Sequence, residues 1–172
     1  MFYTIIKDFL VKKQIKKIVA FGLPAVNNEP IKTIGVLVDG IHFSDKDKFI
    51  NEFKKYANGQ FKLNLLVYRK QPKKDESIDY TFFTRKDITL SGSFSKGEIE
   101  NFVAFPFDLL VNYYDVSNAN LELITAQSKA KFKVGFASVN KELNHFFIAT
   151  FVEKYIDFTK ILFDYLKILK KI

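Results

Sequence analysis

Apolar residues dominate two short segments of the chain, and a segment with helical periodicity lies between them. Residues 107–114, with the sequence Phe-Asp-Leu-Leu-Val-Asn-Tyr-Tyr, form a nearly continuous apolar run. Such a run is typical of a strand that is covered on both faces, as in parallel sheets. Residues 121–130 carry the helical pattern, and residues 132–136 indicate a second strand. The pattern therefore predicts a crossover unit with two parallel strands.

Similar patterns recur on both sides of this unit. Further strands are predicted at residues 31–38, 61–68, 78–83 and 144–149, and further helices at 2–21, 44–57, 95–105 and 150–169. Capping boxes are predicted to begin three of these helices, at Ser44, Ser95 and Thr150, because an acidic residue follows each of them three positions later. The predicted fold is a three-layer, Rossmann-like α/β domain. It has a mostly parallel sheet of about five strands, helices on both faces, and long helices at the N- and C-termini.

The two terminal helices carry unusual apolar patterns. Residues 1–30 are predicted to form an N-terminal helix and linker, and residues 31–172 a single α/β domain. The apolar positions of the first helix rotate around its axis, which favours partial docking on the domain. The alternative is a basic amphipathic segment that contacts a membrane or a partner. The last helix is apolar over most of its circumference, which predicts packing against the sheet and the N-terminal helix, or alternatively a homodimer interface.

Composition and charge narrow the class of protein. The 172 residues suit one ordinary domain, and the net charge of +8 permits weak contact with a polyanion such as RNA. Only Arg69 and Arg85 are arginines, so the positive charge indicates mainly a lysine-rich solvated surface. No apolar run approaches the roughly 20 residues that span a bilayer, and no signal-peptide pattern is present. We therefore expect a cytoplasmic protein without a transmembrane segment.

Several chemistries are excluded by residues that the chain lacks. It contains no cysteine, which rules out disulfides, thiolate nucleophiles and cysteine-ligated metals and is compatible with a reducing cytoplasm. Its seven glycines never occur as Gly-x-Gly, so neither the dinucleotide fingerprint nor a P-loop is present, and the nucleophile elbow is missing too. His42 and His145 are the only histidines and do not form a metal-binding spacing. Neither a metal nor a cofactor is predicted.

Polar side chains stand at the carboxyl ends of two predicted strands. Open α/β sheets bind ligands outside these ends, so five residues are candidates for ligand binding if the two strands are neighbours. They are Asp39, His42, Asn112, Tyr114 and Asp115. The alternative for His42 is a turn with a solvated histidine, and the alternative for the last three is a scaffold role. No catalytic residue is assigned.

The segments 34–39, 107–114 and 121–136 resemble an uncharacterised family of small bacterial proteins, a domain of unknown function, from about residue 32 to the C-terminus. This resemblance implies no activity, cofactor or site. The Asp-Leu-Leu-Val and Lys-Val-Gly-Phe strands also resemble, more weakly, the N-terminal Rossmann-like half of heptosyltransferase-type glycosyltransferases. In those enzymes the donor binds mainly to a second domain. Because this chain has no room for one, the resemblance supports the topology and argues against transferase chemistry.

The sequence leaves the function unknown and favours a non-catalytic binding or interaction protein of the bacterial cytoplasm. One alternative is an RNA- or ribosome-associated protein that uses its lysine-rich surface. Another is an enzyme that acts on a nucleotide or sugar phosphate at the strand carboxyl ends. The enzyme is the less favoured interpretation, because the chain has no glycine-rich phosphate cradle.

Overall fold

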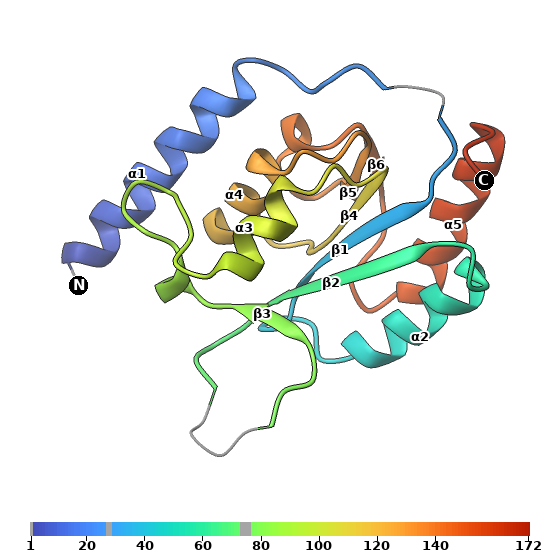
Figure 1. Ribbon diagram of the computed structural model, residues 1–172, viewed down its shortest axis with the longest axis horizontal. Helices are drawn as coiled ribbons and strands as arrows, with labels where there is room; N and C mark the ends of the chain where they lie inside the picture. The colour runs from blue at the N-terminus through green and yellow to red at the C-terminus, as the bar shows by residue number, and fades with distance from the viewer. Residues whose placement is uncertain (1, 27–28, 73–76) are drawn as a thin grey trace.

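A single parallel sheet forms the centre of the computed structural model, which describes residues 2–26, 29–72 and 77–172. The described strands are β1 (Thr33–Asp39), β2 (Lys62–Tyr68), β3 (Thr81–Phe83), β4 (Leu109–Tyr113), β5 (Lys133–Phe136) and β6 (Phe146–Ile148). The helices are α1 (Phe2–Val19), α2 (Lys46–Ala57), α3 (Gly97–Ala104), α4 (Ala119–Gln127) and α5 (Tyr155–Ile168), with short 3₁₀ helices η1 (Arg85–Asp87) and η2 (Lys141–Leu143). Figure 1 shows the strands in the order β3-β2-β1-β4-β5-β6.

This strand order is that of the doubly wound Rossmann-like fold, and all neighbouring pairs are parallel. The predicted α/β architecture is confirmed, with six strands rather than about five. The central expectation is also confirmed, because β1 and β4 lie side by side and Val36 is in register with Val111. The strand order reverses between these two strands, so their carboxyl ends form the switch point of the sheet.

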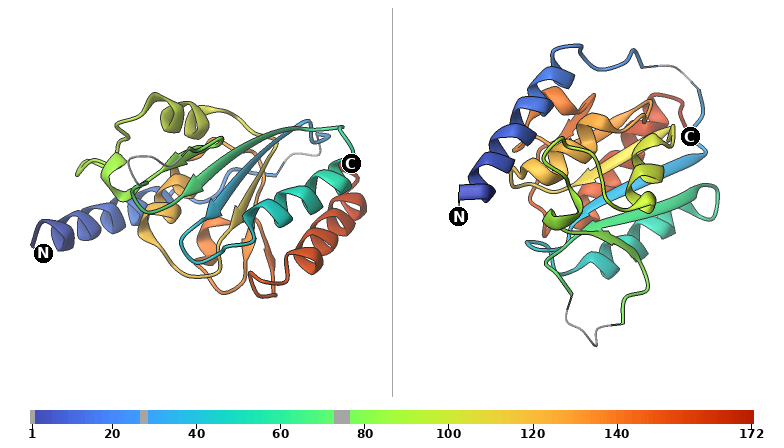
Figure 2. Two further views of the ribbon diagram at one scale, coloured as in Figure 1. Left: turned by 90° about the horizontal axis from the view of Figure 1, so that it is seen from below. Right: turned by 60° about the vertical axis from the view of Figure 1, so that its left-hand side comes forward.

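Helices cover both faces of the sheet, as predicted (Figure 2). One buried cluster joins α1, α3 and α4 to one face, and a second joins α2 and α5 to the other. Alternation along β1 shows how one strand serves both clusters: Leu37 belongs to the first, whereas Val36 and Val38 belong to the second. Strands that are buried on both faces need apolar residues at nearly every position, which explains the continuous apolar runs.

The terminal helices lie on opposite faces of the sheet. α1 packs on the α4 side through Val11 and Ile15, which are 1% and 3% exposed, whereas Ile5 and Phe9 face solvent. α5 packs against α2 and the sheet. The prediction that the last helix contacts the N-terminal helix is therefore wrong, because an apolar pattern indicates burial without indicating which face of the sheet provides it.

The three predicted capping boxes are wrong, because each helix begins one or four residues later than the pattern indicates. The observed N-cap residues of α2, α3 and α5 are Asp45, Lys96 and Lys154, and none of their side chains makes a capping hydrogen bond. A capping box forms instead at η1, where Thr84 and Asp87 exchange side-chain and backbone hydrogen bonds.

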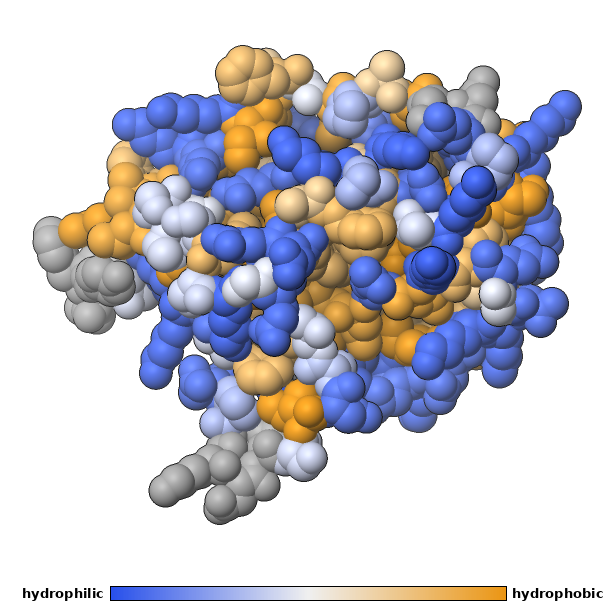
Figure 3. Space-filling view, in the orientation of Figure 1, coloured by the Kyte–Doolittle hydropathy of each residue, from blue (hydrophilic) through white to orange (hydrophobic). Residues whose placement is uncertain are grey.

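On the face seen in Figure 3, hydrophilic side chains alternate with apolar areas, and a broad apolar area lies near the centre of the view. Among the helices of the described residues, none combines the length and the apolar character that crossing a bilayer requires.

Candidate functional site

Asp39 and His42 form a turn directly after β1. The Asp39 carboxylate is buried, and its Oδ1 accepts hydrogen bonds from the backbone N–H groups of Ile41 at 2.9 Å and His42 at 3.3 Å. Its Oδ2 lies 2.7 Å from His42 Nδ1, and the His42 side chain is 52% exposed. Asp39 thus fixes the turn at the carboxyl end of β1, and it holds a largely solvent-exposed imidazole ring there.

Asn112 and Tyr114 lie inside the protein, with 0% and 1% of their surface exposed. Asn112 Nδ2 donates to Asn144 Oδ1 at 2.7 Å, and Asn112 Oδ1 accepts from Thr125 Oγ1 at 2.9 Å. The Tyr114 hydroxyl lies 2.8 Å from the same Thr125 oxygen, and burial raises the pKa of Tyr114. These four side chains form a buried polar network between β4, α4 and the residue that follows η2.

Asp115 is half-buried, and its Oδ2 accepts the backbone N–H of Val152 at 3.2 Å. Within the described residues, no hydrogen bond joins the Asp39–His42 pair to the buried network of Asn112 and Tyr114. Of the five candidates, only His42 and Asp115 keep substantial side-chain surface in contact with solvent. Among the residues that the structure describes, no group of three acidic or histidine side chains could hold a metal ion.

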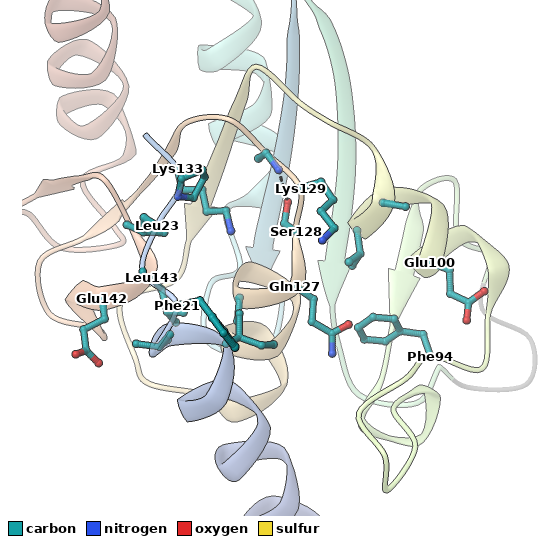
Figure 4. A pocket seen from close by; sticks show the side chains of 18 of the residues that line it. Phe21, Leu23, Phe94, Glu100, Gln127, Ser128, Lys129, Lys133, Glu142 and Leu143 are labelled. Atoms are coloured by element: carbon teal, nitrogen blue, oxygen red, sulfur yellow. Dashed lines mark hydrogen bonds between the residues drawn. The ribbon is translucent and has the colours of Figure 1, made fainter. Parts of the chain in front are cut away.

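A cavity lies at the opposite, amino end of the strands, next to the C-terminal end of α1 (Figure 4). Its volume is about 730 Å³, and its lining comes from α1, residues 21–24 and 93–94, α3, the end of α4, residues 128–130, Lys133 and η2. The sequence analysis missed this cavity because its walls come from segments that are far apart in the chain. We name it the α1 cavity.

His145 links two residues that line the α1 cavity. Its Nδ1 accepts the backbone N–H of Lys133 at 2.9 Å, so Nε2 carries the proton that it donates to the carbonyl oxygen of Pro24, also at 2.9 Å. Desolvation lowers the pKa of His145, which favours this neutral form. The histidine therefore ties the segment after α1 to the amino ends of β5 and β6.

Two lysines point into the α1 cavity from its upper margin in Figure 4, whereas Glu100 and Glu142 point away from it. Lys133 is 3% exposed, and its Nζ donates to the carbonyl oxygen of Thr125 at 2.7 Å. Burial and, as the smaller cause, the positive charge of Lys129 together lower the pKa of Lys133 to about 8. Neither lysine forms an ion pair with any residue that the structure describes. The cavity therefore combines apolar walls with two lysines that make no ion pair with a described residue, while its two lining glutamates point away from it.

Comparison with known proteins identifies a family over nearly the whole chain. The model of a family described as "Family of unknown function (DUF6913)" matches residues 7–169. The chain belongs to this family. The match confirms the resemblance to an uncharacterised family, whereas no curated protein and no solved structure matches the chain. The weaker resemblance to glycosyltransferases consequently gains no support for this DUF6913 protein.

Replacing Lys133 of this DUF6913 protein by methionine should remove a pH-dependent part of its stability. The pKa of the amine falls from its ordinary value of 10.5 to about 8 on folding, so between these pH values the unfolded chain binds more protons. The free energy of unfolding should therefore rise with pH in this window, by up to about 3 kcal/mol at roughly 1.4 kcal/mol per pH unit.

Urea unfolding at about pH 7 and about pH 10 gives the rise in the free energy of unfolding between these pH values. This rise should be larger in the wild type than in Lys133→Met. The exposed Lys129 supplies the control, because Lys129→Met should keep most of the rise. An identical pH dependence in the wild type and Lys133→Met would show that the Lys133 amine titrates as it does in water.

Proposed function

We propose that this protein is a non-catalytic binding protein that holds a small amphipathic carboxylate in the α1 cavity. The observation that carries this proposal is the convergence of Lys129 and Lys133 on an apolar cavity, without an acidic partner among the described residues. As part of the proposal the protein works in the bacterial cytoplasm, with which a chain free of cysteine is compatible.

The size and walls of the α1 cavity suit a molecule with an apolar body. Pockets for small ligands usually measure about 300–1,000 Å³ and combine apolar walls with a few polar groups that fix orientation. The cavity of about 730 Å³ falls within this range, and Ile18, Val103 and Leu143 contribute apolar surface. A chain of several methylene groups would gain about 0.8 kcal/mol for each one that leaves water.

The two lysines have different roles toward the charged end of such a ligand. Lys133 already donates to the Thr125 carbonyl in the last turn of α4, where a cation is also favoured by the helix dipole. Lys129 makes no side-chain hydrogen bond to any described residue, so its amine is available to a carboxylate. A carboxylate between the two would replace water around both amines, and its attraction to the charge of the buried Lys133 would be weakened little by solvent.

The proposal is tested with decanoate and decanol, which share one apolar chain and differ in charge at neutral pH. Isothermal titration calorimetry should show that decanoate binds to the wild type about tenfold more tightly than decanol, because a charge-assisted hydrogen bond contributes about 1.5 kcal/mol or more. Lys129→Met should remove this preference while leaving the binding of decanol unchanged. The matched control is Lys12→Met, because Lys12 is an exposed lysine on α1 that does not line the cavity.

A second variant tests the cavity rather than its charge. Ala104 is exposed at the end of α3 and lines the α1 cavity, so tryptophan at this position would occupy part of its volume without disturbing the core. Ala104→Trp should weaken decanoate and decanol alike. If Lys12→Met lowers decanoate binding as much as Lys129→Met does, or if Ala104→Trp changes neither ligand, the proposal is wrong.

A further inference from the structure

A second, smaller cavity lies at the carboxyl ends of β1 and β2, beside the residue that precedes β3 and on the opposite side of β1 from β4. Its volume is about 320 Å³. Its lining comes from the turn after β1, the first residue of α2, the end of β2 and Tyr80. Ligands of doubly wound sheets bind at this end of the strands. We name this feature the β2 cavity; it lies at the other end of the sheet from the α1 cavity.

The β2 cavity holds a partly buried lysine. The side chain of Lys46 is 13% exposed, and its Nζ lies over the ring of Tyr80, 4.1 Å from the ring centroid. Its ion-pair partner Asp47 has a side chain that is 83% exposed, so water screens the negative charge. The positive charge inside the cavity is thus compensated only weakly.

Two more cations line the same cavity where β2 ends. Arg69 Nη1 donates to the Tyr80 hydroxyl at 3.0 Å, and Arg69 Nε approaches the carbonyl oxygen of Lys70 at 3.4 Å, so the guanidinium is held beside the aromatic ring. Lys70 is exposed and adds a third positive charge. No acidic residue is found among the described residues that line the cavity. Two lysines and one arginine therefore line the β2 cavity.

The beginning of α2 adds to the positive potential. Ser44 and Lys46 line the β2 cavity and flank Asp45, the N-cap residue, whose side chain makes no capping hydrogen bond. The first-turn N–H groups are thus open to another acceptor, and the helix dipole favours an anion there. This contribution is secondary to the side-chain cations that line the cavity.

We propose that the β2 cavity binds the phosphate group of a small phosphate monoester. A phosphate carries close to two negative charges at neutral pH, and arginine matches its oxygens with a planar set of donors. The volume leaves room for a group about the size of a pentose beside the phosphate. Because the site is a small concavity rather than an extended basic strip, it fits a small molecule better than RNA. The inference is independent of the function proposed for the α1 cavity.

The test uses nuclear magnetic resonance of the ¹⁵N-labelled full chain, titrated with ribose 5-phosphate, inorganic phosphate or ribose at constant ionic strength. Ribose 5-phosphate should produce saturable shifts of the backbone amides of Gly40, Lys46 and Arg69, inorganic phosphate should bind more weakly, and ribose should have no effect. Arg69→Gln should raise the dissociation constant for ribose 5-phosphate about tenfold or more, because it removes a charge-assisted contact. Lys46→Gln provides a second variant if Arg69→Gln fails to fold.

The matched control is Lys55→Gln, which removes a lysine of α2 that is 73% exposed and paired with Glu52. This variant, like Lys129→Met in the α1 cavity, should bind ribose 5-phosphate as the wild type does. Shifts that fail to saturate, equal shifts with sodium chloride, or wild-type affinity in both Arg69→Gln and Lys46→Gln would each overturn the proposal. None of these outcomes depends on whether decanoate binds at the α1 cavity.

Discussion

Replacing Tyr113 by alanine should lower the free energy of unfolding by about 4–5 kcal/mol, at the upper end for an aromatic core residue. Tyr113 is completely buried, and its ring stacks on Phe49 with centroids 3.8 Å apart. Phe136 and Phe158 pack edge-to-face with the Tyr113 ring, with ring centroids 5.1 and 5.0 Å from its centroid. Its hydroxyl donates to the carbonyl oxygen of Val152 at 2.6 Å. Alanine would leave both a cavity among four aromatic rings, Phe43 included, and a buried carbonyl without its donor.

Two further variants separate these contributions in urea unfolding experiments. Tyr113→Phe keeps the ring contacts and removes only the hydrogen bond, so it should cost about 1–2 kcal/mol. Phe151→Ala is the control for loss of an aromatic ring, because Phe151 is 72% exposed and should change stability by less than about 0.5 kcal/mol. A cost for Tyr113→Ala no greater than that of Tyr113→Phe would contradict the packing described for α2, α5 and β4.

Replacing Asn112 by leucine should lower the free energy of unfolding by about 3–4 kcal/mol. The substitution removes the donor to Asn144 Oδ1 and the acceptor for Thr125 Oγ1, both buried. Asn144 Nδ2 is already buried without a hydrogen-bond partner, so leucine would leave the whole Asn144 amide unsatisfied. Each buried polar group that loses its partner costs about 1–3 kcal/mol.

A double-mutant cycle gives this prediction a sharper form. If Asn112 and Asn144 stabilise each other, the variant with leucine at both positions should lose at least about 1 kcal/mol less than the sum of the single variants. Asn101→Leu is the control, because Asn101 is exposed on α3. Additive single variants, or an Asn112→Leu protein as stable as the wild type, would favour a direct ligand contact over a scaffold role for Asn112.

The sequence predicts the central part of the fold because the physical signal there is local. Strands covered on both faces require continuous apolar runs, and the runs around Val36 and Val111 indeed form adjacent parallel strands. The strand order and the face chosen by each terminal helix depend on contacts between distant segments. Val11 and Ile15, rather than Ile5 and Phe9, are the buried residues of α1, and nothing within that helix determines this choice.

The two cavities could not be predicted from the chain for a related reason. The five candidate residues stand at predicted strand ends, but Asn112 and Tyr114 continue the inward-facing pattern of their strand and are buried. Lys133 stands at the start of an apolar strand, and this position is a signal in the sequence for a buried charge. The β2 cavity needs the loop near Tyr80 to meet the end of β2, which no local pattern encodes.

The two outer strands of the sheet are its shortest elements. β3 and β6 contain three residues each, whereas the seven-residue ladder between β1 and β2 lies inside the sheet. A second copy of the chain could therefore add a strand only through a few intermolecular backbone hydrogen bonds on either side. This design disfavours edge-to-edge aggregation at high protein concentration, although every strand is rich in residues that promote it.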